Sequence, residues 1–196
     1  MNNKLKTKDF ILIALLTAVY MIIYMVSMLV ITPLGALGHS VSPGICAIFS
    51  GTVIYFMAKK LGKMWQYTIM TVLVMACFTL MGGGYVPWYI TSIGMAIIAD
   101  LIASRKGKEV SPHRIAIASG VLHVGQAWGA IIPASFFVSR YKSYWMQKGQ
   151  TEAEMNNYIK YTAGTWGVIS TVIVFVMAVI GAYLGYLILR KHFKEA

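Results

Sequence analysis

Residues 10–31, FILIALLTAVYMIIYMVSMLVI, form a run of 22 positions without a charged side chain. A helix rises about 1.5 Å per residue, so this run spans about 33 Å and can cross the hydrocarbon core of a bilayer. Lysines precede it at positions 4, 6 and 8, and Thr32-Pro33 follows it. The apolar core of a signal peptide is shorter, about 7–15 residues, so we predict an uncleaved first membrane helix.

The composition of the whole chain is typical of a membrane protein. Of its 196 residues, 58% are hydrophobic and only 12% are charged, whereas soluble domains carry about 25% charged residues. The net charge of +11 is assigned to cytoplasmic loops rather than to nucleic-acid binding. We therefore predict a multi-pass membrane protein, with the lipid bilayer and no nucleic acid as a partner.

Further apolar stretches follow the first and predict an all-α integral membrane protein with one domain, residues 1–196. The predicted transmembrane helices are six, at about residues 10–31, 43–58, 64–81, 86–103, 112–138 and 162–189. Ser42-Pro43 and Ser111-Pro112 each predict a helix start, with serine as the N-cap and proline at the first helical position. Between the helices we expect a polar, glycine-bearing loop at 32–42 and a polar segment at 139–161.

The distribution of lysine and arginine predicts the orientation. With a cytoplasmic N-terminus, 13 of these residues fall in the inner segments. Four fall in the outer segments: Arg140, Lys142, Lys148 and Lys160. Because cytoplasmic loops carry the excess of positive residues, we predict that both termini are cytoplasmic.

A capping pattern marks the last outer segment. Thr151 is followed three residues later by Glu154, as in a capping box, and Met155, Tyr158 and Ile159 then share one helical face. We expect a short surface helix that leads into the sixth span. The segment is either a lid over the outer face or a loop that ends in an early start of the last helix.

The predicted spans contain almost no groups for catalysis. Asp100 is the only acidic residue in a predicted span, and we expect it to reach the interface or to pair with Arg105. The chain lacks HExxH, a GxSxG elbow with a histidine partner, and the phosphate-binding pattern GxxxxGK[ST]. We therefore predict that it is not an enzyme and that it has no ATPase site of its own.

Polar and aromatic side chains instead gather toward the predicted outer half. They predict a substrate-binding site composed of His39, Tyr85, Trp88, Tyr89, His123, Gln126, Trp128 and Trp166. Trp88, Tyr89 and Trp166 are alternatively interface aromatics. His123 lies eleven residues after Pro112, about 16 Å into its helix. Lipid offers no hydrogen bonds there, so His123 and Gln126 either bond another helix or face a ligand.

Small residues predict where helices approach closely. The pairs are Ala14-xxx-Ala18, Gly125-xxx-Gly129 and Gly181-xxx-Gly185. Pro133 has no N–H to offer the carbonyl of Gly129, so we expect a kink in the outer part of that helix.

The chain resembles the S components of energy-coupling factor (ECF) transporters, which import vitamins and micronutrients into prokaryotes. The size, the six spans with both ends inside and the stretch Ala14-Leu15-Leu16-Thr17-Ala18 carry this resemblance. More narrowly it is similar to the MptD-like, or Trep_Strep, putative S components in the loop Thr32–Pro43, the turn Lys59–Lys63 and Ala99-Asp100-Leu101. The resemblance implies an S-component-like bundle that docks through Ala14 and Ala18 on a membrane T component powered by two cytoplasmic ATPases.

By this resemblance the chain captures a substrate between its fourth to sixth helices and delivers it to the T component. The aromatic cluster favours a flat, partly apolar small molecule, either a vitamin-like heterocycle or a porphyrin. Haem is one candidate substrate, since His39 or His123 can ligate iron; we expect no permanently bound cofactor and no metal site. The alternatives are a haem-binding membrane redox protein that uses both histidines, and an orphan membrane enzyme.

Overall fold

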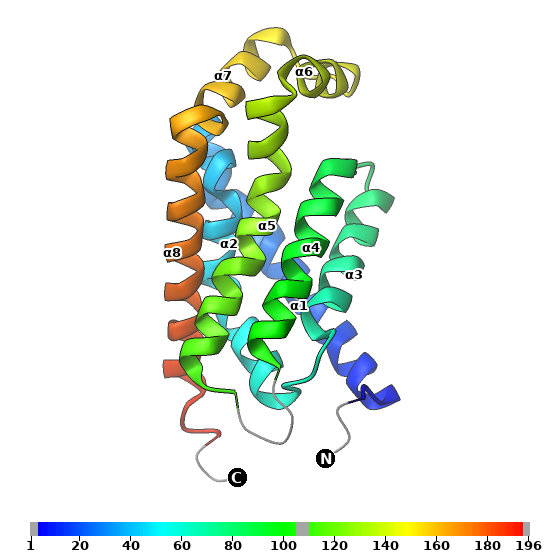
Figure 1. Cartoon of the computed structure of the whole chain (residues 1–196), viewed down its shortest axis with the longest axis vertical. Helices are drawn as coiled ribbons and strands as arrows, with labels where there is room; N and C mark the ends of the chain where they lie inside the picture. The colour runs from blue at the N-terminus through cyan, green and yellow to red at the C-terminus, as the bar shows by residue number, and fades with distance from the viewer. Residues whose placement is uncertain (1–3, 105–109, 194–196) are drawn as a thin grey trace.

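The computed structural model describes residues 4–104 and 110–193, and in this part of the chain every regular element is a helix. The helices are α1 (Thr7–Ile31), the 3-10 turn η1 (Thr32–Leu34), α2 (Gly35–Lys60), α3 (Gln66–Leu80), α4 (Val86–Ala103), α5 (Pro112–Phe136), α6 (Val138–Gln147), α7 (Glu152–Thr162) and α8 (Gly164–Leu189). Six of them pack as a bundle, and the short α6 and α7 lie across one end of it (Figure 1). We call α6 and α7 the cap helices.

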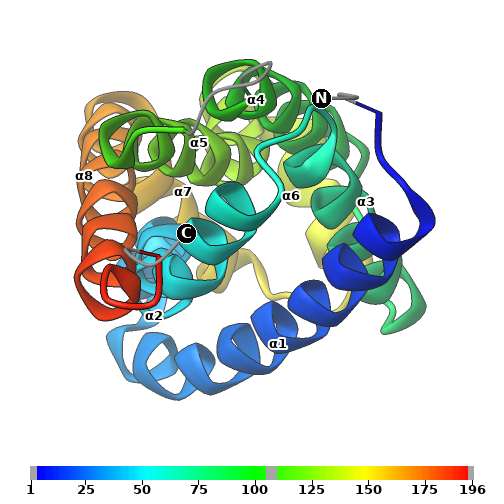
Figure 2. The same cartoon turned by 90° about the horizontal axis from the view of Figure 1, so that it is seen from below.

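The bundle places the start of α1 and the end of α8 at the same end, away from the cap helices (Figure 1). Seen along the bundle, α2 lies inside the outline drawn by the other helices (Figure 2), and it contacts α1, α5 and α8. On the other side α4 packs between α5 and α3. The cap helices therefore lie at one end of the bundle, and the start of α1 and the end of α8 lie at the other (Figure 1).

Four segments of the described chain are long and apolar enough to cross a membrane: 7–60, 86–103, 112–136 and 164–189. The first of these joins α1 and α2, which have 25 and 26 residues. The apolar helix α3 has 15 residues and is about 22 Å long, shorter than a bilayer core. The all-helical architecture is confirmed, while six spans with both ends inside stay a prediction.

The prediction of a loop at 32–42 is wrong, because α2 begins at Gly35 and runs through most of that segment. Pro43 lies inside α2 and does not start it. A proline at this position has no N–H for the carbonyl of His39, four residues earlier. The Ser42 hydroxyl donates to that carbonyl at 2.9 Å instead, so the serine compensates for the proline that follows it.

Other predicted boundaries agree more closely. The fourth helix spans residues 86–103 as predicted, and α5 begins at Pro112 with Ser111 as its N-cap. The polar segment predicted at 139–161 is largely helical, since it contains α6 and most of α7. The backbone breaks between α5 and α6 at Phe137, four residues after Pro133.

Glycines bring α2 and α8 into close contact. A Cβ on Gly51 would lie 2.0 Å from the carbonyl oxygen of Gly181, and one on Gly185 would lie 2.6 Å from that of Gly51. The close packing predicted for Gly181 and Gly185 is confirmed. Gly125 and Gly129 serve the same purpose toward α4, where added Cβ atoms would meet Met95 and Trp88.

Asp100 does not reach the interface as expected. It is fully buried, and its carboxylate accepts hydrogen bonds from the backbone N–H groups of Tyr67 and Thr68, each at 2.9 Å, and from the Thr68 hydroxyl at 2.7 Å. Arg105, the expected partner, lies outside the described residues. The first N–H groups of a helix have no partner within it, so Asp100 of α4 caps the N-terminus of α3.

Replacing Asp100 with alanine is expected to destabilise the protein by about 1–3 kcal/mol, because the buried N–H groups of α3 lose their acceptor. Thermal unfolding in detergent measures this loss. Asp100→Asn keeps one acceptor oxygen and is expected to lose less. Equal stability of the alanine variant and the wild type would contradict the capping role.

Candidate functional site

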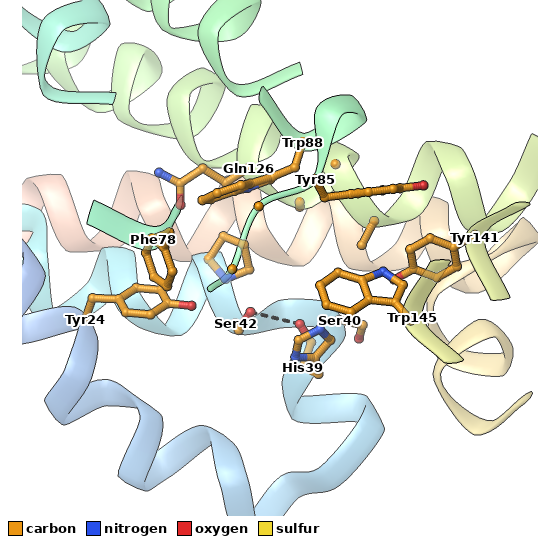
Figure 3. A pocket seen from close by; sticks show the side chains of 16 residues that line it. Tyr24, His39, Ser40, Ser42, Phe78, Tyr85, Trp88, Gln126, Tyr141 and Trp145 are labelled. Carbon is orange, nitrogen blue, oxygen red and sulfur yellow. Dashed lines mark hydrogen bonds between the residues drawn. The ribbon is translucent and has the colours of Figure 1, made fainter. Parts of the chain in front are cut away.

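A cavity of about 200 Å³ lies beneath the cap helices. Its lining comes from α1 to α6 and comprises Tyr24, His39, Ser40, Ser42, Pro43, Phe78, Gly83, Gly84, Tyr85, Trp88, Gln126, Ala127, Gly129, Ala130, Tyr141 and Trp145. Figure 3 shows the rings of this set turned toward a common space. The lining contains no aspartate, glutamate, lysine or arginine.

Aromatic rings form two walls of the cavity. On one side Phe78 meets Tyr24 and Trp88 edge to face, with ring centroids 5.0 and 5.5 Å apart. On the other side Tyr85 lies 5.8 Å from Tyr141 and 5.9 Å from Trp145. Rings in these arrangements hold one another in place. The cavity therefore suits a ligand with flat apolar faces.

Four of the predicted binding residues meet at this cavity: His39, Tyr85, Trp88 and Gln126. His39 comes from α2 and also packs against Tyr158 of α7, with centroids 4.9 Å apart. Tyr85 and Trp88 come from the start of α4, and Gln126 from the middle of α5. The structure thus brings together residues from three helices that are far apart in the sequence.

The remaining predicted residues do not line the cavity. His123 is fully buried, with Nε2 3.4 Å from the Tyr20 hydroxyl and Nδ1 2.8 Å from the carbonyl oxygen of Ser119. The Trp128 indole donates to Thr171 of α8 at 3.2 Å. The Tyr89 hydroxyl bonds that of Thr79, and Trp166 is 43% exposed.

Four lining aromatics were missed from the sequence: Tyr24, Phe78, Tyr141 and Trp145. Tyr24 and Phe78 lie in helices whose apolar residues give no sign of which side faces inward. A signal did exist in α6, where Tyr141, Tyr144 and Trp145 have the spacing of one helical face. The sequence analysis expects a surface helix only from Thr151 onward, so it assigns no helix to the segment that forms α6.

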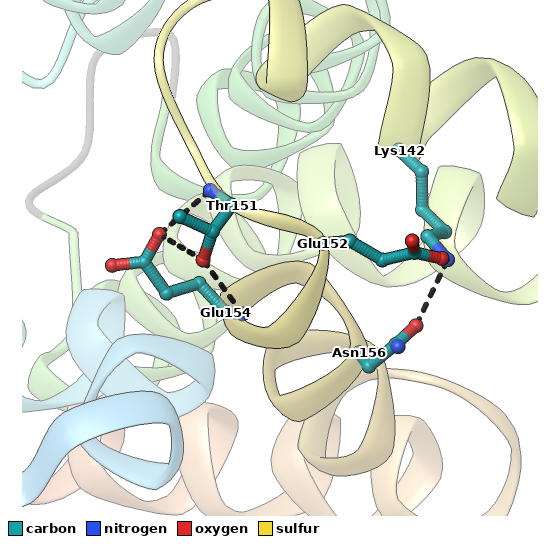
Figure 4. Close-up of polar contacts among 5 residues, drawn as sticks. All are labelled: Lys142, Thr151, Glu152, Glu154 and Asn156. Carbon is teal, nitrogen blue, oxygen red and sulfur yellow. Dashed lines mark hydrogen bonds and ion pairs between the residues drawn. The ribbon is translucent and has the colours of Figure 1, made fainter.

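The cap helices are tied to each other and to the bundle. Lys142 of α6 contacts Glu152 and Asn156 of α7, each at 2.9 Å (Figure 4). The predicted capping box is confirmed: the backbone N–H of Glu154 bonds the Thr151 hydroxyl, and its carboxylate accepts from the Thr151 N–H. The Tyr144 hydroxyl donates to the carbonyl of Gly84, below the cap helices. Because α7 ends at Thr162 and α8 begins at Gly164, the expected surface helix is separate from α8.

The contact between the cap helices is expected to weaken in acid. The hydrogen bond and the charge of Lys142 lower the pKa of Glu152 below its ordinary value of 4.5. A lowered folded-state pKa gives a contribution that is complete above the ordinary value and is lost as pH falls through the lowered one. Amide hydrogen exchange over residues 152–162, corrected for its intrinsic pH dependence, should therefore accelerate below about pH 4.5.

Glu152→Gln is the control for this effect. It is expected to raise exchange in α7 near neutral pH and to match the wild type in acid. Identical exchange of the two proteins at neutral pH would contradict a role for the ion pair.

The residues present do not fit a haem held between histidines. His39 lines the cavity, whereas His123 lies in the core with both ring nitrogens within hydrogen-bonding distance of neighbours. Within residues 4–104 and 110–193, no group of three or more histidine, cysteine or acidic side chains is placed to hold a metal ion.

One family model matches this chain over residues 7–195, and its description is a hypothetical bacterial integral membrane protein, Trep_Strep. No curated protein and no solved structure matches the chain. The family description and the long apolar helices together place it in the bacterial plasma membrane as a multi-pass protein. The chain belongs to the Trep_Strep family of bacterial integral membrane proteins.

Proposed function

We propose that this chain is the substrate-binding S component of an ECF-type ABC importer. It captures a vitamin-like micronutrient in the cavity beneath the cap helices, which face the outside. It then delivers the substrate by docking on a membrane T component that is powered by two cytoplasmic ATPases. The chain itself binds and releases the substrate without catalysis.

The aromatic cavity is the observation that carries this proposal. It is lined by residues of five bundle helices and of the cap helix α6, an arrangement typical of a ligand site. Its lining combines rings with a few polar groups and has no arrangement of nucleophile, base and acid. Such a site holds a small molecule and offers no chemistry to transform it.

The outer face of α1 supports the docking step. Ala14 and Ala18 are exposed, and they lie among exposed large side chains such as Ile11, Leu15 and Ile22. Small residues between large ones form a shallow notch in which another helix can approach closely. The notch lies in the half of α1 away from the cap helices, so docking and capture use different parts of the molecule (Figure 1).

The cavity also narrows the class of substrate. At about 200 Å³ it is smaller than the pockets of about 300–1,000 Å³ that hold drug-sized ligands. This size favours a one- or two-ring heterocycle over a porphyrin. The position of His123 away from the lining removes one of the two candidate haem ligands, so neither haem transport nor a haem-based redox function is favoured.

Docking is tested by replacing both Ala14 and Ala18 with tryptophan. The bulky rings fill the notch, and we expect copurification with the T component and the ATPases to fall by at least about tenfold, a loss of about 1.4 kcal/mol of binding free energy. Substrate uptake by cells should fall in parallel, while ligand binding by the isolated chain stays intact.

The matched control places the same change on another exposed helix face. Val172 and Val176 of α8 are also four residues apart and are 58% and 47% exposed. Replacing both with tryptophan should leave complex formation unchanged. Full complex formation by the α1 variant would refute docking through this notch.

A further inference from the structure

We propose that the cavity selects a flat heterocycle that donates a hydrogen bond to Gln126 and accepts one from Trp145. This inference rests on the proposed function, because it names the class of substrate for the same cavity. Vinylogous-amide rings such as 4-quinolones, in which a ring N–H and a ring carbonyl lie at opposite positions of one ring, have the required groups. Tyr20 and His123 act as positioning residues, since they determine which end of the Gln126 amide faces the ligand.

The argument starts at His123, whose tautomer is defined by its surroundings. Nδ1 lies 2.8 Å from the carbonyl oxygen of Ser119, an atom that can only accept, so Nδ1 carries the proton. The ring is fully buried, and no acidic side chain in the described chain is bonded to it, so the neutral form is favoured. Nε2 is therefore an acceptor.

Tyr20 connects His123 to the cavity residue Gln126 through two hydrogen bonds. Its hydroxyl lies 3.4 Å from His123 Nε2 and donates to it, because that nitrogen has no proton. The Cys46 thiol is also beside Tyr20, but sulfur is the weaker acceptor. With its own proton used in this way, the Tyr20 oxygen accepts from Gln126 Nε2 at 3.3 Å.

Gln126 then presents its carbonyl oxygen to the cavity. Its nitrogen is engaged by Tyr20, and among the described residues no hydrogen bond reaches the side-chain oxygen. In Figure 3 this oxygen lies on the side of Tyr24 and Phe78, and the nitrogen lies on the far side. A ligand that donates an N–H or O–H satisfies the oxygen, whereas an acceptor placed there would face another acceptor.

A second polar atom of the lining is also without a partner. The indole N–H of Trp145 is buried, and no atom of the described residues accepts its hydrogen bond. Trp145 belongs to the cap helix α6 and lies on the other side of the view from Gln126 (Figure 3). A buried donor without a partner is costly, so a ligand carbonyl or ring nitrogen is the expected acceptor.

The test uses two isomeric probes with the detergent-purified chain. Both 6-methyl-4-quinolone and 1-methyl-4-quinolone are flat, have a ring carbonyl and contain the same atoms, but only the first has an N–H. Calorimetry should show that the wild type binds the 6-methyl isomer at least about tenfold tighter, as expected for one hydrogen bond in a buried site.

Three variants locate the groups responsible. Gln126→Met removes the acceptor and should reduce the ratio of the two affinities to about one. Tyr20→Phe should also lower the ratio, because the amide is then free to present its nitrogen. Trp145→Phe should weaken the binding of both probes and leave the ratio of their affinities unchanged, since both probes carry the carbonyl. Tyr67→Phe, which removes another buried hydroxyl that donates to Ile54, should leave the ratio at the wild-type value.

If Tyr20 only supported the fold, Tyr20→Phe would weaken the binding of both probes equally. The ratio of the two affinities therefore separates a positioning role from a role in stability. Equal binding of the isomers by the wild type, or binding of neither, would overturn the proposed ligand class. The importer role would still be supported if the chain copurified with a T component and carried another small molecule. If the chain neither copurified with a T component nor carried a small molecule, the proposed function itself would be refuted.

Discussion

Replacing Gly181 with leucine is expected to prevent the bundle from folding. A Cβ at this position would lie 2.1 Å from the carbonyl oxygen of Ala47 and 2.9 Å from the Cα of Ile48. These are backbone atoms of α2, so no side chain can move aside, and α2 and α8 must separate. Overpacking of this kind costs about 3 kcal/mol or more. The yield of monodisperse protein and its thermal midpoint in detergent measure the effect.

Gly94 provides the matched control. It also lies within an apolar helix, but a Cβ there would meet no atom within 4 Å. Gly94→Leu should therefore fold with near-wild-type stability, and leucine even has the higher helix propensity. If both variants folded equally well, the close contact between α2 and α8 would not be a determinant of the fold.

Replacing Ser42 with phenylalanine is expected to abolish ligand binding while the fold is retained. Ser42 lines the cavity from α2, and its hydroxyl donates to the carbonyl of His39 in its own helix. An apolar cavity of about 150 Å³ accommodates benzene, so a phenyl group would occupy much of the available 200 Å³. We expect at least about a hundredfold loss of affinity, or about 2.7 kcal/mol, measured by calorimetry or substrate uptake.

Ser42→Ala keeps the cavity open and serves as the control. It removes only the hydroxyl that compensates for Pro43, so a modest loss of stability and near-normal ligand binding are expected. Wild-type uptake by the phenylalanine variant would show that the substrate binds elsewhere.

The helices themselves could largely be predicted, because apolar runs and charged loops have a direct physical cause in the bilayer. The fourth helix agrees at both ends, 86–103, and the start of α5 at Pro112 agrees as well. The start of α2 could not be predicted in this way. A Ser-Pro pair can cap a helix or sit within one, and the structure places this pair within α2, which already begins at Gly35.

The site was predictable in part. Tyr85 and Trp88, at the start of the fourth helix, belong to the predicted binding site, and both line the cavity. His123 and Gln126 are three residues apart on α5, and three residues on a helix are about 60° short of a full turn. That difference places His123 in the core and Gln126 in the cavity, and only the neighbouring helices determine which residue faces where.

Native mass spectrometry of the chain, extracted with its partners from the bacterium that encodes it, tests the central claim most directly. The account predicts an assembly of one copy of this chain with a membrane T component and two ATPases. It also predicts that the chain released from this assembly carries a small-molecule mass, which the Ser42→Phe variant lacks. A chain that is found alone and at its bare mass would contradict the account.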